Sequence, residues 1–271
     1  MKKLVIGVLF LFFCGFVCLD LSVAQATDLP DKKQIITKAH NAYYSLRNLG
    51  LSEFQASIRP NWELTLKKEL QSNPEGAQNG LKMLNGIHFS MTLDPQGNVK
   101  VEHNTDAPPP NEAAAAGFQQ IYSGMDQAVS GFFATWSLFM LTSPFPAIES
   151  EYRLESVAGQ YRLSYKDGGS DVVTTMNKDL TITGIVVDSP QFKSTILPQF
   201  AKSPKGLMLS SYTGDYKPAS GPGVVHLNIR IDYQEVSGFQ LPRALDLDSI
   251  YDGAPTQMQL AFSSYSVKTK P

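Results

Sequence analysis

Hydrophobic and polar positions repeat with different periods in the two parts of the chain. Between residues 31 and 141, apolar residues recur at three- and four-residue steps, which is typical of amphipathic helices. From Glu149 onward they alternate with polar residues, as Tyr152 and Leu154 do with Arg153, and turn residues separate the runs. No helical pattern lies between these runs, so we expect an antiparallel sheet rather than βαβ units. The predicted fold class is α+β.

The first part of the chain is predicted to be mostly helical. Helices are expected over Asp31–Arg47, Trp62–Gln71, Pro74–Leu84 and about Asn111–Leu141. Strands are expected around Phe54–Ile58, over Ile87–Leu93 and over Asn98–His103, the last two joined by a turn at Asp94–Gly97. Asn61 is placed to cap the second helix, and Gly124 and Gly131 are positions where the long helix can kink or split.

The second part is predicted to be a meander of strands. After Tyr152–Glu155 and Tyr161–Tyr165, strands are expected at Val172–Met176, Leu180–Val187, Phe192–Leu197, Gly206–Thr213, Val224–Glu235, Phe239–Leu247 and Met258–Val267. Turn compositions such as Asp167-Gly168-Gly169 lie between them.

Residues 1–26 have the pattern of a secretory signal peptide. Lys2 and Lys3 precede an apolar run, Leu4–Val17, and Ala24-Gln25-Ala26 provides the small residues of a cleavage site. A membrane anchor is the alternative, but the apolar run of about 14 residues is shorter than the roughly 20 that span a bilayer. Cleavage would leave a single domain, residues 27–271, in the periplasm or outside the cell. It would also remove both cysteines, because Cys14 and Cys18 lie in the leader.

The charge balance argues against a nucleic-acid partner. Removing Lys2, Lys3 and Asp20 from the totals leaves 21 basic and 24 acidic residues, a net charge of −3. A nucleic-acid-binding protein normally shows a basic stripe, and the sequence has none. The composition leaves the oligomeric state open.

No motif for catalysis, metal binding or a cofactor is present. The four histidines do not form an HExxH or HxH pair, and GxSxG, Walker and GxGxxG motifs are absent. A dyad of His103 with Glu102 or Asp106 is conceivable, and Asp246 and Asp248 place two acids on one strand face. We expect a protein that is not an enzyme and needs no cofactor.

The predicted helix Asn111–Leu141 is the strongest candidate for a functional element. Its C-terminal half is apolar on nearly every face, so it is either buried or in contact with something apolar. One interpretation is a core helix packed on the sheet. The other is a helix that lines a cavity for an acyl chain, together with the first strands of the meander. The candidate ligand-binding residues are Met125, Phe132, Phe133, Trp136, Phe139, Met140, Tyr152, Leu154, Tyr161 and Leu163.

Several segments together resemble a known family. These are the helix Ile35–Leu46 after a signal peptide, the strand with Phe54-Gln55-Ala56, the run Ile231–Leu245 with its Gly-Phe-Gln-Leu-Pro sequence, and the final strand Ala261–Val267. In this respect the chain is similar to the outer-membrane lipoprotein carriers (LolA/LolB-like) and their periplasmic relatives. It is longer than those carriers, with a helical insertion at about 61–146. Their Trp-x-x-(Lys/Arg)-Arg-Pro strand has no counterpart, so no carrier binding residue is assigned.

The resemblance implies a curved antiparallel sheet, an unclosed half-barrel covered by the N-terminal and inserted helices. It also implies a transport role, in which the pocket binds lipid, acyl chains or an acylated protein, with other envelope proteins as further partners. The alternatives are a protein-interaction module of the cell envelope that binds no lipid, and a hydrolase with a site near His103 and Asp106.

Overall fold

The structure, a computed structural model, describes residues 27–28, 31–220 and 223–270. The predicted signal peptide, with both cysteines, lies outside the described residues. The helices of the described part are α1 (Lys32–Ala42), α2 (Trp62–Thr65), α3 (Lys67–Ser72), α4 (Pro74–Asn85) and α5 (Glu112–Met140).

Thirteen strands of the described chain form one sheet. They are β1 (Thr27–Asp28), β2 (Leu51–Pro60), β3 (Ile87–Leu93), β4 (Val99–Thr105), β5 (Tyr152–Val157), β6 (Gln160–Asp167), β7 (Ser170–Met176), β8 (Ile182–Asp188), β9 (Phe192–Ser203), β10 (Gly206–Pro218), β11 (Val225–Val236), β12 (Phe239–Tyr251) and β13 (Ala254–Thr269).

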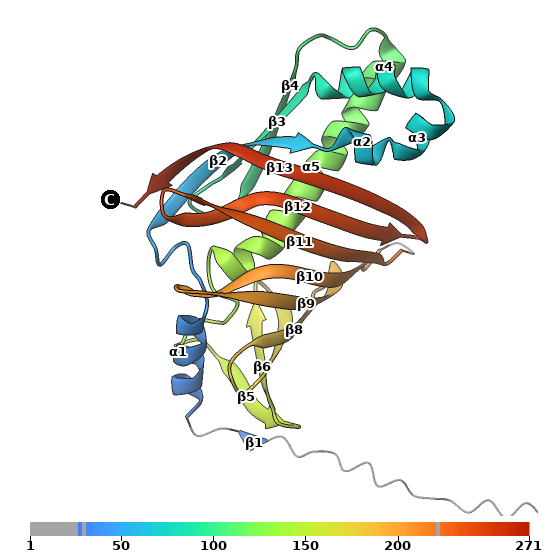
Figure 1. Ribbon diagram of the computed structural model, residues 1–271. Coiled ribbons are helices and arrows are strands. Elements are labelled where there is room, and N and C mark those ends of the chain that lie inside the picture. Colours follow the sequence, from blue (N-terminus) through green and yellow to red (C-terminus); the bar gives the residue numbers. More distant parts are fainter. Residues whose placement is uncertain (1–26, 29–30, 221–222, 271) are drawn as a thin grey trace, which may run out of the picture.

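The sheet is antiparallel and open. Its order is β1-β5-β6-β7-β8-β9-β10-β11-β12-β13-β2-β3-β4, so β5 to β13 form a meander and β2 joins its far side through β13. Each strand pair of the described residues is antiparallel, as the alternating pattern predicts. The α+β class and the antiparallel sheet are therefore confirmed. Figure 1 shows that the strands change direction strongly from β5 to β4, so the sheet is curved as well as twisted.

One face of the sheet carries the core, and α5 lies against it (Figure 1). The buried residues of β2 and β3 alternate with polar ones, for example Phe54, Ala56 and Ile58. α5 contacts β4 near its N-terminal half and β10 near its C-terminal end. Its buried side chains recur at helical spacing: Phe118, Met125, Val129, Phe132, Phe133, Trp136, Phe139 and Met140.

Helices α2, α3 and α4 form a cap beyond the end of β2, and we call these three helices the helical cap (Figure 1). Asparagine caps define its boundaries. The side chain of Asn61 accepts a hydrogen bond from the Leu64 N–H, and that of Asn73 accepts one from the Gly76 N–H. The cap predicted at Asn61 is confirmed, although the helix that follows it is broken into α2 and α3 at Leu66.

Two helix predictions are corrected. The first helix ends at Ala42 and not at Arg47, because Tyr43 adopts an extended conformation and forms a β-bridge with Leu207. The long helix is continuous over 29 residues, so neither Gly124 nor Gly131 splits it into two elements. No described helix combines the length and apolar character needed to cross a membrane.

The segment after α1 joins the helices to the sheet. The backbone N–H of Tyr44 donates to Leu207 O, and that of Leu46 donates to Met140 O at the end of α5. The guanidinium of Arg47 donates to the carbonyls of Leu51 and Asp94, so it connects the start of β2 to the β3–β4 turn. These contacts bring three distant parts of the chain together at one end of α5.

Gly206 allows this segment to approach β10 closely. Its φ is +120°, and an added Cβ would lie 2.7 Å from the carbonyl carbon of Tyr43 and from the nitrogen of Tyr44. Both atoms belong to the backbone and cannot move without breaking the β-bridge to Leu207. Glycine is therefore required at this position for space as well as for conformation.

We expect Gly206→Ala to destabilise the protein by at least ~2 kcal/mol, through backbone strain and steric overlap. Gly238→Ala is the matched control, because Gly238 also has a positive φ of +83° but an added Cβ would meet no atom within 4 Å. It should cost about 1 kcal/mol. Urea unfolding of both variants measures the difference, and equal free energies of unfolding would contradict the close approach.

Candidate functional site

The C-terminal half of α5 forms the centre of the core. Phe133, Trp136, Phe139 and Met140 have exposed fractions of 0%, and that of Phe132 is 2%. Their rings contact sheet residues on several strands: Phe54 lies edge-on to Trp136, Phe262 edge-on to Phe133, and Phe200 edge-on to Phe139. The core-helix interpretation therefore describes this half of α5.

A short chain of hydrogen bonds fixes α5 to the sheet. Trp136 Nε1–H donates to Tyr233 Oη at 3.1 Å, and the Tyr233 hydroxyl donates to Leu209 O at 2.7 Å. The backbone N–H of Leu209 in turn lies 3.4 Å from Met140 Sδ. A buried polar group without a partner destabilises the fold. These hydrogen bonds therefore favour one position of α5 on the sheet over any shifted one.

The other predicted ligand-binding residues belong to the same core. Met125, Leu154 and Leu163 are buried, and Tyr152 and Tyr161 are half-buried against them. The structure therefore brings the predicted residues into one hydrophobic cluster. Four cavities of the described residues have none of the predicted α5 residues in their lining, and Tyr152 lines one of them, beside Lys32.

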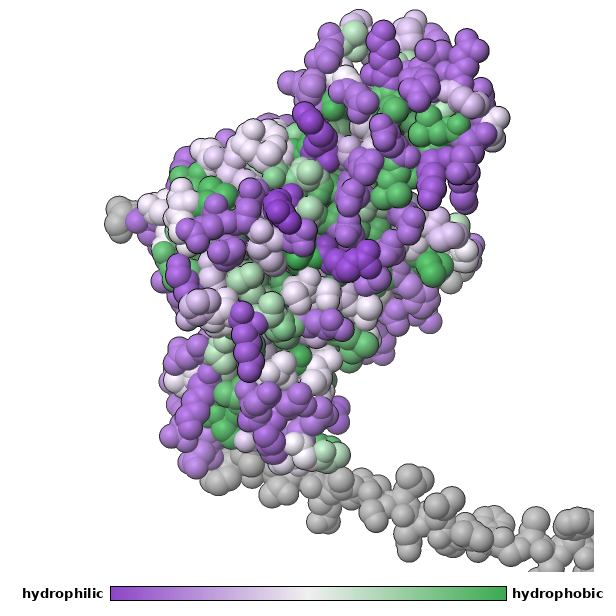
Figure 2. All heavy atoms as spheres, viewed as in Figure 1, coloured by the Kyte–Doolittle hydropathy of each residue, from purple (hydrophilic) through white to green (hydrophobic). Residues whose placement is uncertain are grey.

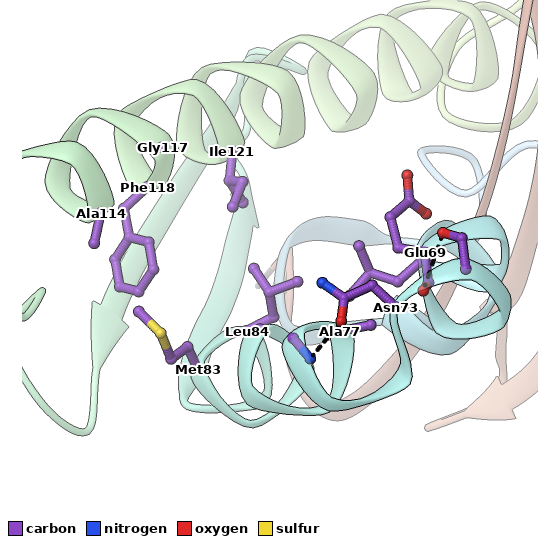
Figure 3. Close-up of a pocket in the computed structure, with 13 residues that line it drawn as sticks. Glu69, Asn73, Ala77, Met83, Leu84, Ala114, Gly117, Phe118 and Ile121 are labelled. Carbon is purple, nitrogen blue, oxygen red and sulfur yellow. Dashed lines mark hydrogen bonds between the residues drawn. The ribbon is translucent and has the colours of Figure 1, made fainter.

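An apolar groove lies instead along the N-terminal half of α5. It has a volume of about 420 Å³ and runs between α5 and the helical cap. Phe118 and Ile121 point from α5 toward α4, where Met83 and Leu84 face them (Figure 3). We call this feature the cap groove, and its lining residues are Leu66, Glu69, Ser72, Asn73, Gly76, Ala77, Gly80, Met83, Leu84, Ala114, Gly117, Phe118 and Ile121.

Small residues create the space in the cap groove. Gly80 on α4 and Gly117 on α5 both line it, and an added Cβ at either position would meet no atom within 4 Å. Larger side chains at these positions would fill the groove. Glycine inside a helix costs about 0.5–1 kcal/mol relative to alanine, so these residues lower the stability of their helices while they leave the groove open.

The polar groups at the groove are mostly engaged elsewhere. Asn73 caps α4, and the Ser72 hydroxyl donates to the Lys68 carbonyl within α3. Glu69 is exposed and lies at the α3 end of the groove. The groove therefore offers apolar contacts along its length and one carboxylate at one end. Figure 2 shows apolar side chains at the surface of the helical cap, among hydrophilic ones.

The His103–Asp106 dyad considered from the sequence is not formed. Asp106 accepts a hydrogen bond from His88 Nε2 at 2.7 Å, while His103 stacks on Tyr122 of α5 at 3.6 Å between ring centroids. The pleat explains the difference, because His103 lies on the α5 face of β4. Within the described chain, no group of three or more His, Cys, Asp or Glu residues is arranged to hold a metal ion.

No protein family, curated protein or solved structure matches this chain. The resemblance to the lipoprotein carriers therefore remains a prediction, and the site is interpreted from its geometry.

Sequence reasoning missed the cap groove. The α5 residues predicted to bind a ligand, from Met125 to Met140, lie in or next to its more apolar C-terminal half, away from the groove. The available signal was the coincidence of small residues on two predicted helices, around Gly80 and around Gly117. What the pattern lacks is the pairing of α4 with α5, which depends on the tertiary fold.

The buried tyrosines predict how the stability of this core depends on pH. Burial raises the pKa of Tyr43, Tyr212, Tyr233 and Tyr265 well above the usual range, and raises that of Tyr165 to about 12. In the unfolded chain these groups lose their protons near a pKa of ~10. Their contribution to stability is therefore complete below pH ~10 and is lost as the pH rises above it.

We expect the free energy of unfolding to fall above pH ~10 by about 1.4 kcal/mol per pH unit for each such tyrosine. Urea unfolding over a series of alkaline pH values measures the slope. Ultraviolet absorbance should show phenolate from these residues only as the protein unfolds. A constant stability across this range, or early ionisation in the folded protein, would contradict the described packing.

Proposed function

We propose that the protein binds an apolar chain, such as the acyl chain of a lipid or of an acylated protein, in the cap groove. It acts as a non-catalytic carrier or sensor. The observation that carries the proposal is an open apolar groove of about 420 Å³, next to helix glycines whose replacement would close it. This volume lies within the ~300–1,000 Å³ range of small-molecule sites. The predicted signal peptide supports a place in the cell envelope.

The sheet is, in this proposal, a half-barrel whose inner face is already occupied. The resemblance to the carriers leads one to expect an acyl chain against the concave side. Here the side chains of Phe133 and Trp136 take that position and are fully buried. The bound chain therefore lies beside the N-terminal half of α5, where Phe118 and Ile121 face the helical cap.

The energetics of an apolar chain suit a shallow groove. Each exposed CH₂ group costs roughly 0.8 kcal/mol in water, so covering part of a chain gives useful affinity. The groove is open along one side, and Met83 in its wall is 36% exposed. Methionine adapts to ligands of different shape. Such a site holds a chain and also releases it.

A partner protein is the second candidate occupant. The groove lies between two helices, and an amphipathic helix that presents apolar residues on one face would fit against Phe118 and Met83. The exposed methionine at the groove favours this alternative, because methionine is common at surfaces that accept several partners. This hypothesis corresponds to a non-catalytic interaction module.

We expect dodecanoate to bind the purified protein saturably, with a negative heat-capacity change in calorimetry. Gly117→Leu should weaken binding by about tenfold or more, which corresponds to ~1.4 kcal/mol. Its side chain would occupy the groove, while the helix itself gains stability from the loss of glycine. The fold should therefore remain intact, which circular dichroism checks.

Gly124→Leu is the matched control on the same helix. Gly124 is exposed, an added Cβ there meets no atom within 4 Å, and it does not line the groove. This variant should bind dodecanoate as the unmodified protein does. Equal affinities in all three proteins would place the ligand elsewhere. Absence of binding in the unmodified protein would leave the helical partner as the better candidate.

A further inference from the structure

A second hollow lies where β2 and β3 separate, and it is polar. The β2–β3 ladder ends at the pair Ile58–Phe89, and the chains then diverge as β2 leads into α2. The space between them has a volume of about 560 Å³. We call it the strand-end cleft, and its lining residues are Ser57, Ile58, Arg59, Pro60, Trp62, Asn85, Ile87, His88, Phe89, Ser263 and Ser264.

The third side of the cleft is an irregular part of β13. The pairing of β13 with β2 shifts between Ser263 and Ser266, which is a β-bulge. Ser264 in this bulge has a φ of +52°, a conformation that non-glycine residues adopt rarely. Bulges and strained residues occur often beside binding sites, where they direct a side chain or a backbone group. Here they place two serines at the cleft.

Among the residues that line the strand-end cleft, Arg59 is the one arginine or lysine. On the same face of the sheet, Arg230 pairs with Asp246 and Arg243 pairs with Asp232. Among the described residues, the Arg59 guanidinium makes no ion pair or hydrogen bond, while its backbone pairs with Ala261 of β13. Its guanidinium is therefore available to a ligand. Figure 2 shows that strongly hydrophilic side chains gather where the helical cap meets the sheet.

The acidic groups nearby are displaced from the cleft or already engaged. Asp106 holds His88, and Asp232 holds Arg243 in the adjoining hollow, which Arg59 and Trp62 also line. Glu63 lines that adjoining hollow but not the strand-end cleft. The cleft therefore combines one free cation with the hydroxyls of its serines and the amide of Asn85.

We propose that the strand-end cleft binds a small oxyanionic ligand, a carboxylate or phosphate group held by Arg59 and assisted by the hydroxyls of Ser57, Ser263 and Ser264. A guanidinium matches both groups, because its planar fork donates two parallel hydrogen bonds. The serine hydroxyls donate to the remaining lone pairs of a carboxylate or to the other oxygens of a phosphate. This inference does not depend on the cap groove, since the cleft and the groove share no lining residue.

Tryptophan provides a direct reporter for the test. The chain has two tryptophans. Trp62 lines the cleft and is 7% exposed, while Trp136 is fully buried in the core. In ¹⁵N-labelled protein, inorganic phosphate and acetate are titrated separately at constant ionic strength, and the two indole cross-peaks are followed. We expect the Trp62 peak to shift saturably with at least one anion and the Trp136 peak to stay in place.

Arg59→Gln should weaken the binding by about tenfold or more, because it removes the charge-assisted hydrogen bonds. Arg243→Gln is the matched control, since it removes an exposed arginine that is paired with Asp232 in the adjoining hollow. It should leave the affinity within about twofold, as surface ion pairs contribute little.

Each outcome decides the proposal. A response to phosphate alone, or to acetate alone, names the ligand class, and a response to both supports the shared oxyanion chemistry. No saturable shift of Trp62 with either anion would overturn the site. An unchanged affinity in Arg59→Gln, or an equal loss in Arg243→Gln, would show a general charge effect and would also overturn it.

Discussion

Burial of the C-terminal half of α5 against one face of the sheet is the interaction on which the rest of the structure depends. Trp136 lies at its centre, packed against Phe54 and Phe133 and hydrogen-bonded to Tyr233. The open sheet has no second sheet to cover this face in the described residues, so the helix supplies the opposing apolar surface. The segment from Tyr43 to Gly50 then joins α1 and β2 to the end of α5. If α5 did not pack against the sheet, the apolar face of most strands would be exposed to water.

The same helix has a different environment at its other end. Beyond Met125, toward the N-terminus, α5 leaves the centre of the core and faces the helical cap across the cap groove. Gly80 and Gly117 lie there, whereas the C-terminal half of α5 carries large side chains. Because glycine has no side chain, the space between α4 and α5 is left unfilled. We interpret this division as the basis of function: one half of α5 is fixed, and the other half provides an open apolar surface. The strand-end cleft adds a polar surface where the cap meets the sheet.

Much of the fold could be predicted from the sequence, because the alternation of apolar and polar residues and the capping residues match the observed strands and helices. The boundaries of β3 follow from the alternation of apolar and polar residues, and the N-cap of α2 follows from Asn61. The end of α1 could not be predicted, since Tyr43 continues the helical pattern but is held in extended form by β10, which is distant in the sequence. The placement of β2 beside β13 likewise depends on long-range pairing.

The candidate site could be predicted only in part. The apolar run of α5 predicts a buried helix, and its residues lie in the hydrophobic core. The hydrophobic periodicity predicts that the side chains of Phe133 and Trp136 are buried. It does not indicate whether they contact a ligand or the protein's own sheet. That distinction depends on the volume left between elements, as does the role of Gly117. The partner of His88 also follows from strand register, and not from distance along the chain.

Hydrogen exchange along α5, with and without dodecanoate, tests the division of this helix most directly. We expect amides near residues 114–121 and in α4 to become more protected when the ligand binds. Amides near residues 132–140 should exchange only through global unfolding, with or without ligand. Faster exchange or new protection confined to residues 132–140 would contradict the account, because it would show that the ligand displaces the helix and enters the concave face of the sheet.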